Sequence, residues 1–257
     1  ICFVDGDDTI SNRFGEYIQE NEEDNEILLF LWTRKRQFTE EERVKVYDLT
    51  FLDIQSLQCA TLNKYQKGRM KYSVLEPTSA CAKAFRKNWL IEKQLRFPTG
   101  IVSGEDTFFN LNAFGKAGKV RSVYAPVYYY RCNTNSVTRR YNPELKSNFA
   151  AVENLIEQYI SKNEREDLQK SQYLYKVSAF MFIALQDCCH PNNTKSFKER
   201  KKDFLELRKE IQYEEAFQKA QIGAFPLPKA FVCQLCKNRC FWILCLLNQL
   251  QNIKKAG

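Results

Sequence analysis

Two short acidic segments carry most of the chemistry that this sequence could perform. The first is Asp5-Gly6-Asp7-Asp8, directly after the apolar run Ile1–Val4, and the second is Glu105-Asp106. An apolar strand that empties into carboxylates fixes them at the edge of a sheet, where α/β proteins bind their ligands. Paired carboxylates bind a hard divalent cation, which in turn neutralises phosphate groups. The first segment is therefore a candidate metal and phosphate site.

Taken alone, the first acidic segment fits several interpretations, of which a solvated turn is the simplest. A calcium loop is disfavoured because Ile10 stands where that loop requires glycine. Asp5, Asp7 and Thr9 match the strand-Asp-x-Asp-x-Thr pattern of haloacid-dehalogenase-type phosphatases, with Asp5 as nucleophile and Asp7 as acid/base. Nucleotide-sugar glycosyltransferases also use Asp-x-Asp, to hold a metal on the donor diphosphate. These alternatives stay open at this point.

The second acidic segment opens a predicted helix. Apolar side chains follow Gly104 at helical spacing as far as Phe114. Free backbone N–H groups and the helix dipole keep a carboxylate at this position ionised. At a crevice such a carboxylate can act as a general base toward a hydroxyl. The alternative is an acidic pair that only stabilises its own helix.

Further motifs surround these acids in a fixed order: Lys83-Ala84-Phe85-Arg86, Arg96-Phe97-Pro98-Thr99-Gly100-Ile101, Glu105-Asp106-Thr107-Phe108-Phe109-Asn110, Tyr128-Tyr129-Tyr130-Arg131 and Asn135-Ser136. Together with the first acidic segment, this ordered set resembles the family 2 glycosyltransferases. That family is the inverting GT-A group that builds bacterial capsular, lipopolysaccharide and exopolysaccharide chains. The resemblance covers residues 1–142. The phosphatase interpretation leaves the Tyr-Arg-Asn-Ser segment unexplained, so the sequence favours a glycosyltransferase.

The resemblance implies a binding site for a nucleotide-sugar donor, with UDP as the expected carrier. Asp7 would be the main ligand of a divalent metal, Mn²⁺ or Mg²⁺, with Asp5 near the metal or the ribose and Asp8 in support. Arg131 and Ser136 would lie on a loop that closes over the diphosphate. Arginine suits that position because its planar guanidinium pairs with phosphate oxygens.

The resemblance also implies the acceptor side of the reaction. Asp106 would be the catalytic base that deprotonates the acceptor hydroxyl, and Glu105 would shape the acceptor site. Attack on the anomeric carbon from the face opposite the leaving group would invert its configuration. The expected acceptor is a saccharide or a lipid-linked hydroxyl, in the synthesis of a surface polysaccharide. Lys83 and Arg86 either line the cleft or are solvated charges.

The pattern of apolar residues predicts an α/β fold of the GT-A, Rossmann-like type. The expected strands are 1–4, as a central strand buried on both faces, 27–32 and 120–130. The expected helices are 12–24, 39–63, 104–115, 144–162, 165–189, 195–220 and 229–254. We expect three parts: the C-terminal part of a GT-A domain in 1–142, a helical extension in 143–222, and a linker with a basic amphipathic helix in 223–257.

Members of the resembled family open with further strands that bind the nucleoside base, and this sequence starts at the strand with the metal motif. We therefore expect an N-terminally truncated chain whose sheet lacks its first strands. An inactive glycosyltransferase fragment is the main alternative function. A second departure is Cys81, where the family often has tryptophan before the lysine.

Composition narrows the functional classes further. The chain is 44% hydrophobic and 27% charged, which is typical of a globular protein. No apolar run approaches the ~18 residues of a membrane span. The ten cysteines follow no disulfide framework, so we expect a protein with reduced cysteines in the cytoplasm. The net charge of +8 fits polyanionic ligands. Residues 229–257 contain basic residues and no acid, which predicts contact with the inner face of an anionic membrane or packing on the protein itself. Interleaved acids in 195–219 disfavour nucleic-acid binding.

Overall fold

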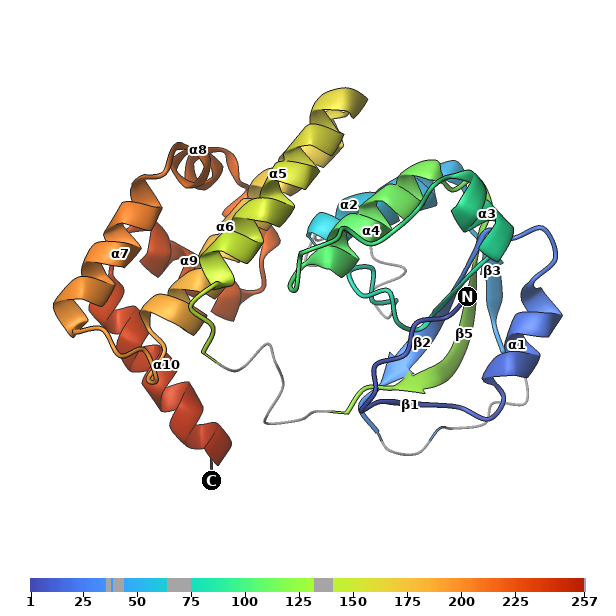
Figure 1. The fold of residues 1–257 in the computed structure, drawn as a ribbon, viewed down its shortest axis with the longest axis horizontal. Helices are drawn as coiled ribbons and strands as arrows, with labels where there is room; N and C mark the ends of the chain where they lie inside the picture. The colour runs from blue at the N-terminus through green and yellow to red at the C-terminus, as the bar shows by residue number, and fades with distance from the viewer. Residues whose placement is uncertain (36–37, 39–43, 64–74, 132–140, 257) are drawn as a thin grey trace. The chain divides into compact units, whose positions relative to one another are not determined.

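The computed structural model describes residues 1–35, 38, 44–63, 75–131 and 141–256. The chain divides into two compact units, one of Ile1–Lys64 with Gly68–Asn133 and one of Thr134–Gly257 with Tyr65–Lys67. In their described residues, the first unit is an α/β structure with a mixed sheet and the second contains only helices (Figure 1). The predicted α/β class is confirmed for the first unit.

The sheet of the first unit has the strand order β1-β5-β2-β4, and β3 pairs with β5 as well. Its strands are β1 (Thr9–Ile10), β2 (Ile27–Thr33), β3 (Val46–Asp48), β4 (Lys83–Phe85) and β5 (Val120–Tyr129). β2 and β5 run parallel, and the other pairs are antiparallel. The carboxyl ends of the parallel pair meet where Trp32 lies opposite Tyr128.

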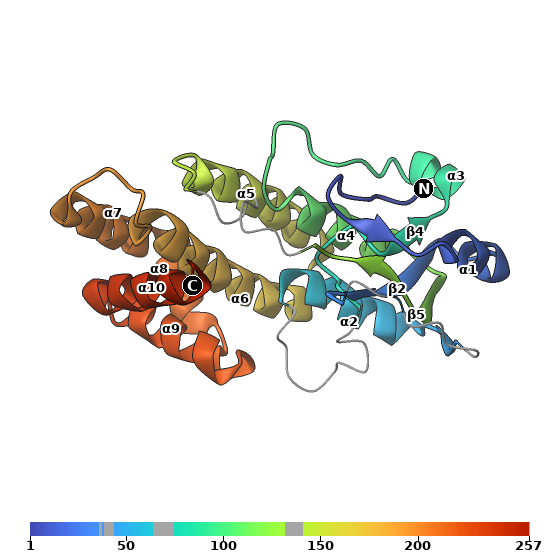
Figure 2. The same ribbon diagram turned by 90° about the horizontal axis from the view of Figure 1, so that it is seen from below.

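Helices cover both faces of this sheet (Figures 1 and 2). They are α1 (Phe14–Asn21), α2 (Phe51–Leu62), α3 (Lys87–Glu92) and α4 (Glu105–Lys116). Ile27 and Leu29 of β2 belong to a buried cluster with residues of α2, α3 and α4. Leu28 and Phe30, which alternate with them, belong to a second cluster with α1. The strand predicted at 27–32 is therefore a strand buried on both faces, as its unbroken apolar run indicates.

The run Ile1–Val4 does not have the central position that its apolar character predicted. Within the described ranges its only bridges are isolated ones, from Cys2 to Ala84 of β4 and from Phe3 to Cys81, just before β4. The two ends of the run are 50% and 45% exposed. The prediction of a central strand was wrong because the longer apolar run of β2 occupies the interior, so this segment lies along the sheet margin.

The helix predicted over 39–63 is shorter than expected. Residues 46–48 form β3, whose Val and Tyr favour extended backbone. The helix α2 begins after Thr50, whose hydroxyl accepts from the N–H of Asp53 while the Asp53 carboxylate accepts from the N–H of Thr50. This reciprocal capping box fixes the helix start. The start predicted at Thr39 lies outside the described residues.

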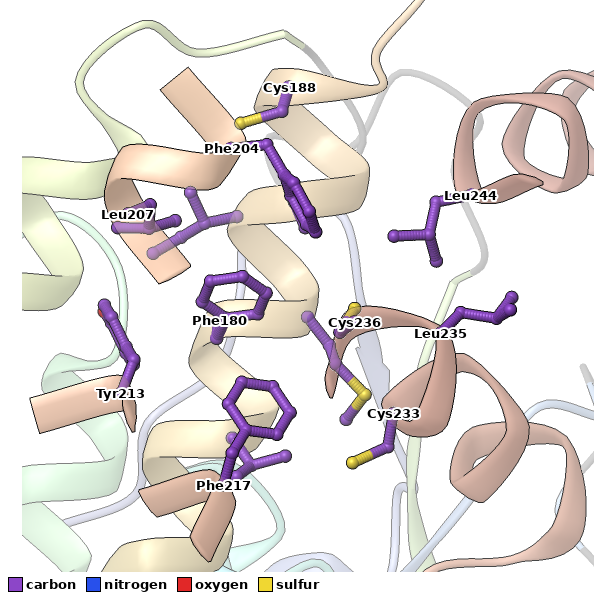
Figure 3. Packing of buried hydrophobic residues seen from close by; sticks show 14 of the residues in the cluster. Phe180, Cys188, Phe204, Leu207, Tyr213, Phe217, Cys233, Leu235, Cys236 and Leu244 are labelled. Atoms are coloured by element: carbon purple, nitrogen blue, oxygen red, sulfur yellow. The ribbon is translucent and has the colours of Figure 1, made fainter. Parts of the chain in front are cut away.

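The second unit consists of helices around one apolar core. They are α5 (Leu145–Asn163), α6 (Glu166–Ile183) with a π-helical turn at Ala184–Cys188, α7 (Phe197–Lys209), α8 (Ile211–Lys219), α9 (Leu227–Lys237) and α10 (Phe241–Ala256). Phe180 lies at the centre of the core (Figure 3), with ring centroids of Phe204, Tyr213 and Phe217 at 5.5, 5.4 and 5.2 Å. Such edge-to-face contacts add to the free energy of apolar burial.

Two of the helices predicted in this unit are each divided into two. The segment 195–220 breaks at Glu210, whose backbone is extended. The segment 229–254 breaks before Phe241, where Arg239 has a left-handed φ of 58°. Cys236 and Leu244, which flank this break, are buried in the core (Figure 3). The C-terminal segment 229–254 therefore packs on its own unit with one face. None of the helices in the described ranges is long and apolar enough to span a membrane.

Candidate active site

Aromatic packing brings the two acidic segments of the first unit together. Phe97 stacks on Phe109 at 4.2 Å between ring centroids, and Phe3 meets Phe97 edge-on at 5.0 Å. Phe3 precedes Asp5 by two positions, and Phe109 lies one turn after Asp106 on α4. The apolar contacts of these three rings therefore fix the acidic turn beside the start of α4.

The carboxylates of this site are close enough to influence one another. Partial burial raises the pKa of Asp5, and the negative charges of Asp8, Asp106 and Asp7 raise it further. Burial also raises the pKa of Glu105, with contributions from the charges of Asp106 and Asp5. Since like charges disfavour ionisation of their neighbours, Asp5, Glu105 and Asp106 affect one another although they come from distant parts of the sequence. Asp5 and Asp7 are exposed, and Asp8 is half-buried.

Tyr128 anchors the acidic turn to the end of β5. Its hydroxyl donates to Asp8 Oδ2 at 2.7 Å and accepts from the N–H of Asp5 at 3.1 Å. The backbone N–H of Arg131 donates to Asp8 Oδ1 at 2.7 Å. The Tyr128 side chain is almost fully buried, and burial raises its pKa, as do hydrogen bonds with Cys81 and Asp8. Tyr128 therefore keeps its proton and holds the turn at the carboxyl ends of the parallel strands, where α/β proteins bind ligands.

Asp106 lies in the first turn of α4, after Gly104, whose φ of 89° is readily adopted only by glycine. Its Oδ2 accepts from the N–H of Ala80 at 3.0 Å. Burial raises the pKa of Asp106, while the Ala80 N–H, the charge of Lys83 and the Ser79 hydroxyl lower it. Asp106 is thus a half-buried carboxylate with a higher proton affinity than an ordinary aspartate.

Lys83 holds the segment Glu76–Ala80, whose last residue donates its N–H to Asp106. The Lys83 ammonium group donates to the carbonyl of Glu76 at 2.6 Å and to the carbonyl of Ser79. Burial lowers the pKa of Lys83 to about 8. Cys81, two residues earlier, is buried as well and hydrogen-bonds with Tyr128 and Asp5. Lys83 therefore does not line an open cleft and is not a solvated charge.

The side chains of the other residues predicted for the site have no hydrogen bond or ion pair with its acidic residues in the described structure. Arg131 is exposed and contacts Asp8 through its backbone. Arg86 is exposed, and its guanidinium donates to the carbonyl oxygens of Asn25 and Glu23, so it is bound elsewhere. Ser136 lies outside the described residues.

Some residues of the site could not be assigned from sequence. Tyr128 belonged to the Tyr-Tyr-Tyr-Arg motif but was given no role of its own, and Cys81 stood out only as a departure from the resembled family. Lys83 was named from sequence as a cleft residue or a solvated charge, but its burial was not predicted. The run Cys-Ala-Lys-Ala-Phe could have indicated that burial, because a charge among small and apolar residues must find buried partners.

The described residues contain no group of three or more His, Cys, Asp or Glu side chains arranged to hold a metal ion. Mg²⁺ is commonly bound by one or two carboxylates together with phosphate oxygens of a substrate. The exposed carboxylates of Asp5 and Asp7 fit that kind of shared coordination.

Solved structures of other proteins resemble this chain. No family model and no curated protein matches the chain. The solved structure of S. aureus TarS 1-349 in complex with UDP-GlcNAc is similar, with a TM-score of 0.44 and 12% sequence identity. The match covers 98% of this chain and 67% of that one. The function proposed below rests on the site geometry and not on this likeness.

Proposed function

We propose that this protein is a glycosyltransferase of GT-A type that moves a sugar from a nucleotide sugar to a hydroxyl group with inversion. One observation carries the proposal: the exposed acidic turn, which Tyr128 holds at the end of β5, lies beside the half-buried Asp106, because Phe3 packs on Phe109 at 5.8 Å between ring centroids. The two sets of carboxylates differ in their surroundings. The carboxylates of the acidic turn can bind a metal and a diphosphate, while the Asp106 carboxylate can accept a proton.

The donor would bind at the acidic turn. Asp7 and Asp5 would hold Mn²⁺ or Mg²⁺, since both are exposed and carry the oxygen ligands that these ions prefer. Bound there, the ion would stabilise the negative charge of the leaving nucleoside diphosphate. Asp8 already accepts hydrogen bonds from Tyr128 and Arg131, so it shapes the turn and supports the ligands. UDP is the carrier that we propose, with Arg131 and Ser136 near the diphosphate.

The acceptor would be activated by Asp106. Its carboxylate would take the proton from the acceptor hydroxyl as that oxygen attacks the anomeric carbon. A pKa above the usual aspartate range suits this role, because a general base works best when its pKa approaches the working pH. The nucleoside diphosphate leaves from the opposite side of the anomeric carbon, so a single displacement inverts its configuration. Glu105 would border the acceptor.

The proposed acceptor is a saccharide or a lipid-linked hydroxyl, in surface polysaccharide synthesis on the cytoplasmic side of the membrane. Trp242, Leu246 and Leu250 recur at helical spacing on α10 and are 64%, 46% and 49% exposed. Residues 229–257 contain basic residues and no acid. An exposed apolar stripe in a basic segment supports peripheral contact with an anionic membrane.

Calorimetry with a panel of UDP-sugars in the presence of Mn²⁺, followed by a UDP-release assay with saccharide acceptors, tests the proposal. Asp7→Ala should abolish Mn²⁺-dependent donor binding. Asp106→Asn should retain donor binding and lose about 10²- to 10⁴-fold in transfer rate, the usual contribution of a general base. Asp24→Asn is the matched control, because the Asp24 side chain is 85% exposed.

Three results would contradict the proposal. An Asp106→Asn protein with a near-native transfer rate would remove the base. Absence of donor binding in the wild-type chain would indicate an inactive fragment. Release of phosphate from p-nitrophenyl phosphate, abolished by Asp5→Asn, would identify a phosphatase instead.

A further inference from the structure

A single peptide group lies between Lys83 and Asp106. The carbonyl of Ser79 accepts a hydrogen bond from the Lys83 ammonium group. The N–H of Ala80 donates to Asp106 Oδ2 at 3.0 Å. This carbonyl and this N–H belong to the same peptide unit, so a positive charge, a peptide dipole and a negative charge are joined in one hydrogen-bonded chain.

The chain is built into the interior of the first unit. Lys83 is only 3% exposed, and Ala80 is 1% exposed. Burying an ammonium group costs free energy unless hydrogen bonds replace its water. Here carbonyl oxygens of the segment Glu76–Cys81 replace it, so Lys83 keeps its hydrogen bonds in the interior and these carbonyls keep a donor.

Two further contacts tie the same segment to α4. The Ser79 hydroxyl hydrogen-bonds with the Asp106 carboxylate. Asn110, one turn after Asp106, donates from Nδ2 to the carbonyl of Thr78 at 3.0 Å. The segment that Lys83 holds therefore fixes the position of the Asp106 carboxylate and restricts the rotation of its side chain.

Hydrogen bonds in such a chain polarise one another. A cation on the carbonyl side makes the peptide N–H a stronger donor, by about 10–30% per bond. The donor that is strengthened here is the Ala80 N–H, which points at the carboxylate proposed as the base. Removal of the cation would weaken that bond and free the segment to move, and a shift of about 1 Å in a catalytic group can cost about 10²-fold in rate.

We propose that Lys83 is a positioning residue, which acts through the Ser79–Ala80 peptide to orient the Asp106 carboxylate. Since this role rests on the transferase function proposed above, it concerns the chemical step. The donor ligands Asp5 and Asp7 belong to a different segment. Loss of Lys83 should therefore slow the transfer and leave donor binding in place.

The test compares Lys83→Met with Lys87→Met, a control at an exposed lysine on α3. We expect kcat of Lys83→Met to fall about 10- to 100-fold, with the calorimetric donor affinity within about twofold of wild type. Lys87→Met should match wild type in both. A double variant of Lys83→Met and Asp106→Asn should be no slower than Asp106→Asn alone, because a residue that acts through another has nothing left to act on.

Different results would contradict the role of Lys83 and the proposed function. Wild-type kcat in Lys83→Met, a fall in kcat matched by lost donor affinity, or multiplicative losses in the double variant would each overturn the role of Lys83. A wild-type protein without donor binding or transfer would overturn the proposed function itself. Lys83→Gln, which keeps amide N–H donors but no charge, serves if Lys83→Met does not fold; if neither folds, Lys83 is purely structural and the inference is wrong.

Discussion

Glu153 on α5 gives a quantitative prediction about the helical unit. The side chain is 4% exposed, and its Oε1 accepts from the Tyr213 hydroxyl at 3.0 Å. Its Oε2 has no hydrogen-bond partner within the part of the chain that the structure describes. Burial raises the pKa of Glu153 from the ordinary value of 4.5 to about 7. We predict that Glu153→Gln removes a pH-dependent loss of stability.

The sign and size of the effect follow from this pKa. A carboxyl whose pKa is raised by folding holds its proton more tightly in the folded state, so stability falls as the pH rises from 4.5 through about 7. The whole shift corresponds to about 3 kcal/mol in the free energy of unfolding. Between pH 5 and pH 8, the loss due to Glu153 is about 2.5 kcal/mol. Glutamine keeps an acceptor for Tyr213 and does not ionise.

Urea unfolding followed by far-UV circular dichroism at both pH values measures the effect. The stability of Glu153→Gln relative to wild type should increase by about 2.5 kcal/mol from pH 5 to pH 8. Glu166→Gln is the control, since the Glu166 side chain is 79% exposed in a surface ion pair that contributes little. A difference between Glu153→Gln and wild type that is the same at both pH values would refute the reasoning.

Other predictions concern the first unit. Because burial raises the pKa of Asp106, the acid limb of kcat for transfer should lie above the usual aspartate range, as a pH–rate profile at saturating donor would show. Tyr128→Phe removes the bonds to Asp8 and to the N–H of Asp5, so calorimetry should find weaker Mn²⁺-dependent donor binding, by about tenfold. Thr50→Ala removes the cap of α2 and should lower the free energy of unfolding by about 1 kcal/mol, measured by urea titration.

Local sequence was sufficient to predict elements whose pattern is long or sharply bounded. The start of α4 was evident because Gly104 precedes two acids and a helical run of aromatics. β2 was evident from its unbroken apolar run. The segment Ile1–Val4 has the same composition in shorter form, and composition does not say which of two apolar runs takes the interior. That choice depends on pairing with β4 and β5, which local pattern does not contain.

Breaks in helices without glycine or proline were harder to predict. The segment 229–254 carries a continuous stripe of apolar residues, yet Arg239 takes a left-handed backbone conformation in its middle. The strain at this residue is offset by packing, because the break lets both Cys236 and Phe241 enter the core. An arginine has no local preference for this conformation. The turn is therefore imposed by tertiary contacts.

The candidate site shows the same division between local pattern and tertiary contact. The acids were visible as residue types, and α4 was visible as their platform, but their meeting depends on Phe3, Phe97 and Phe109, which are ordinary core residues by themselves. Tyr128 was hidden among neighbouring tyrosines, and only its burial at the end of β5 separates it from them. Chemistry-bearing residues can thus be nominated from sequence, whereas the residues that orient them are defined by contacts.

This division explains why the buried positioning groups are the sharper test of the proposed function. Exposed acids such as Asp7 are found on many protein surfaces, and an acidic turn alone fits a solvated loop. Lys83 is a buried cation that donates to the peptide behind Asp106, and its burial costs desolvation free energy. A solvated acidic loop requires no such buried cation. An apolar residue at 83 would fill the same space but leave the carbonyl oxygens of Glu76 and Ser79 without this donor, so the peptide behind Asp106 would lose its anchor. The arrangement around Lys83 therefore favours a site in which the orientation of one carboxylate matters.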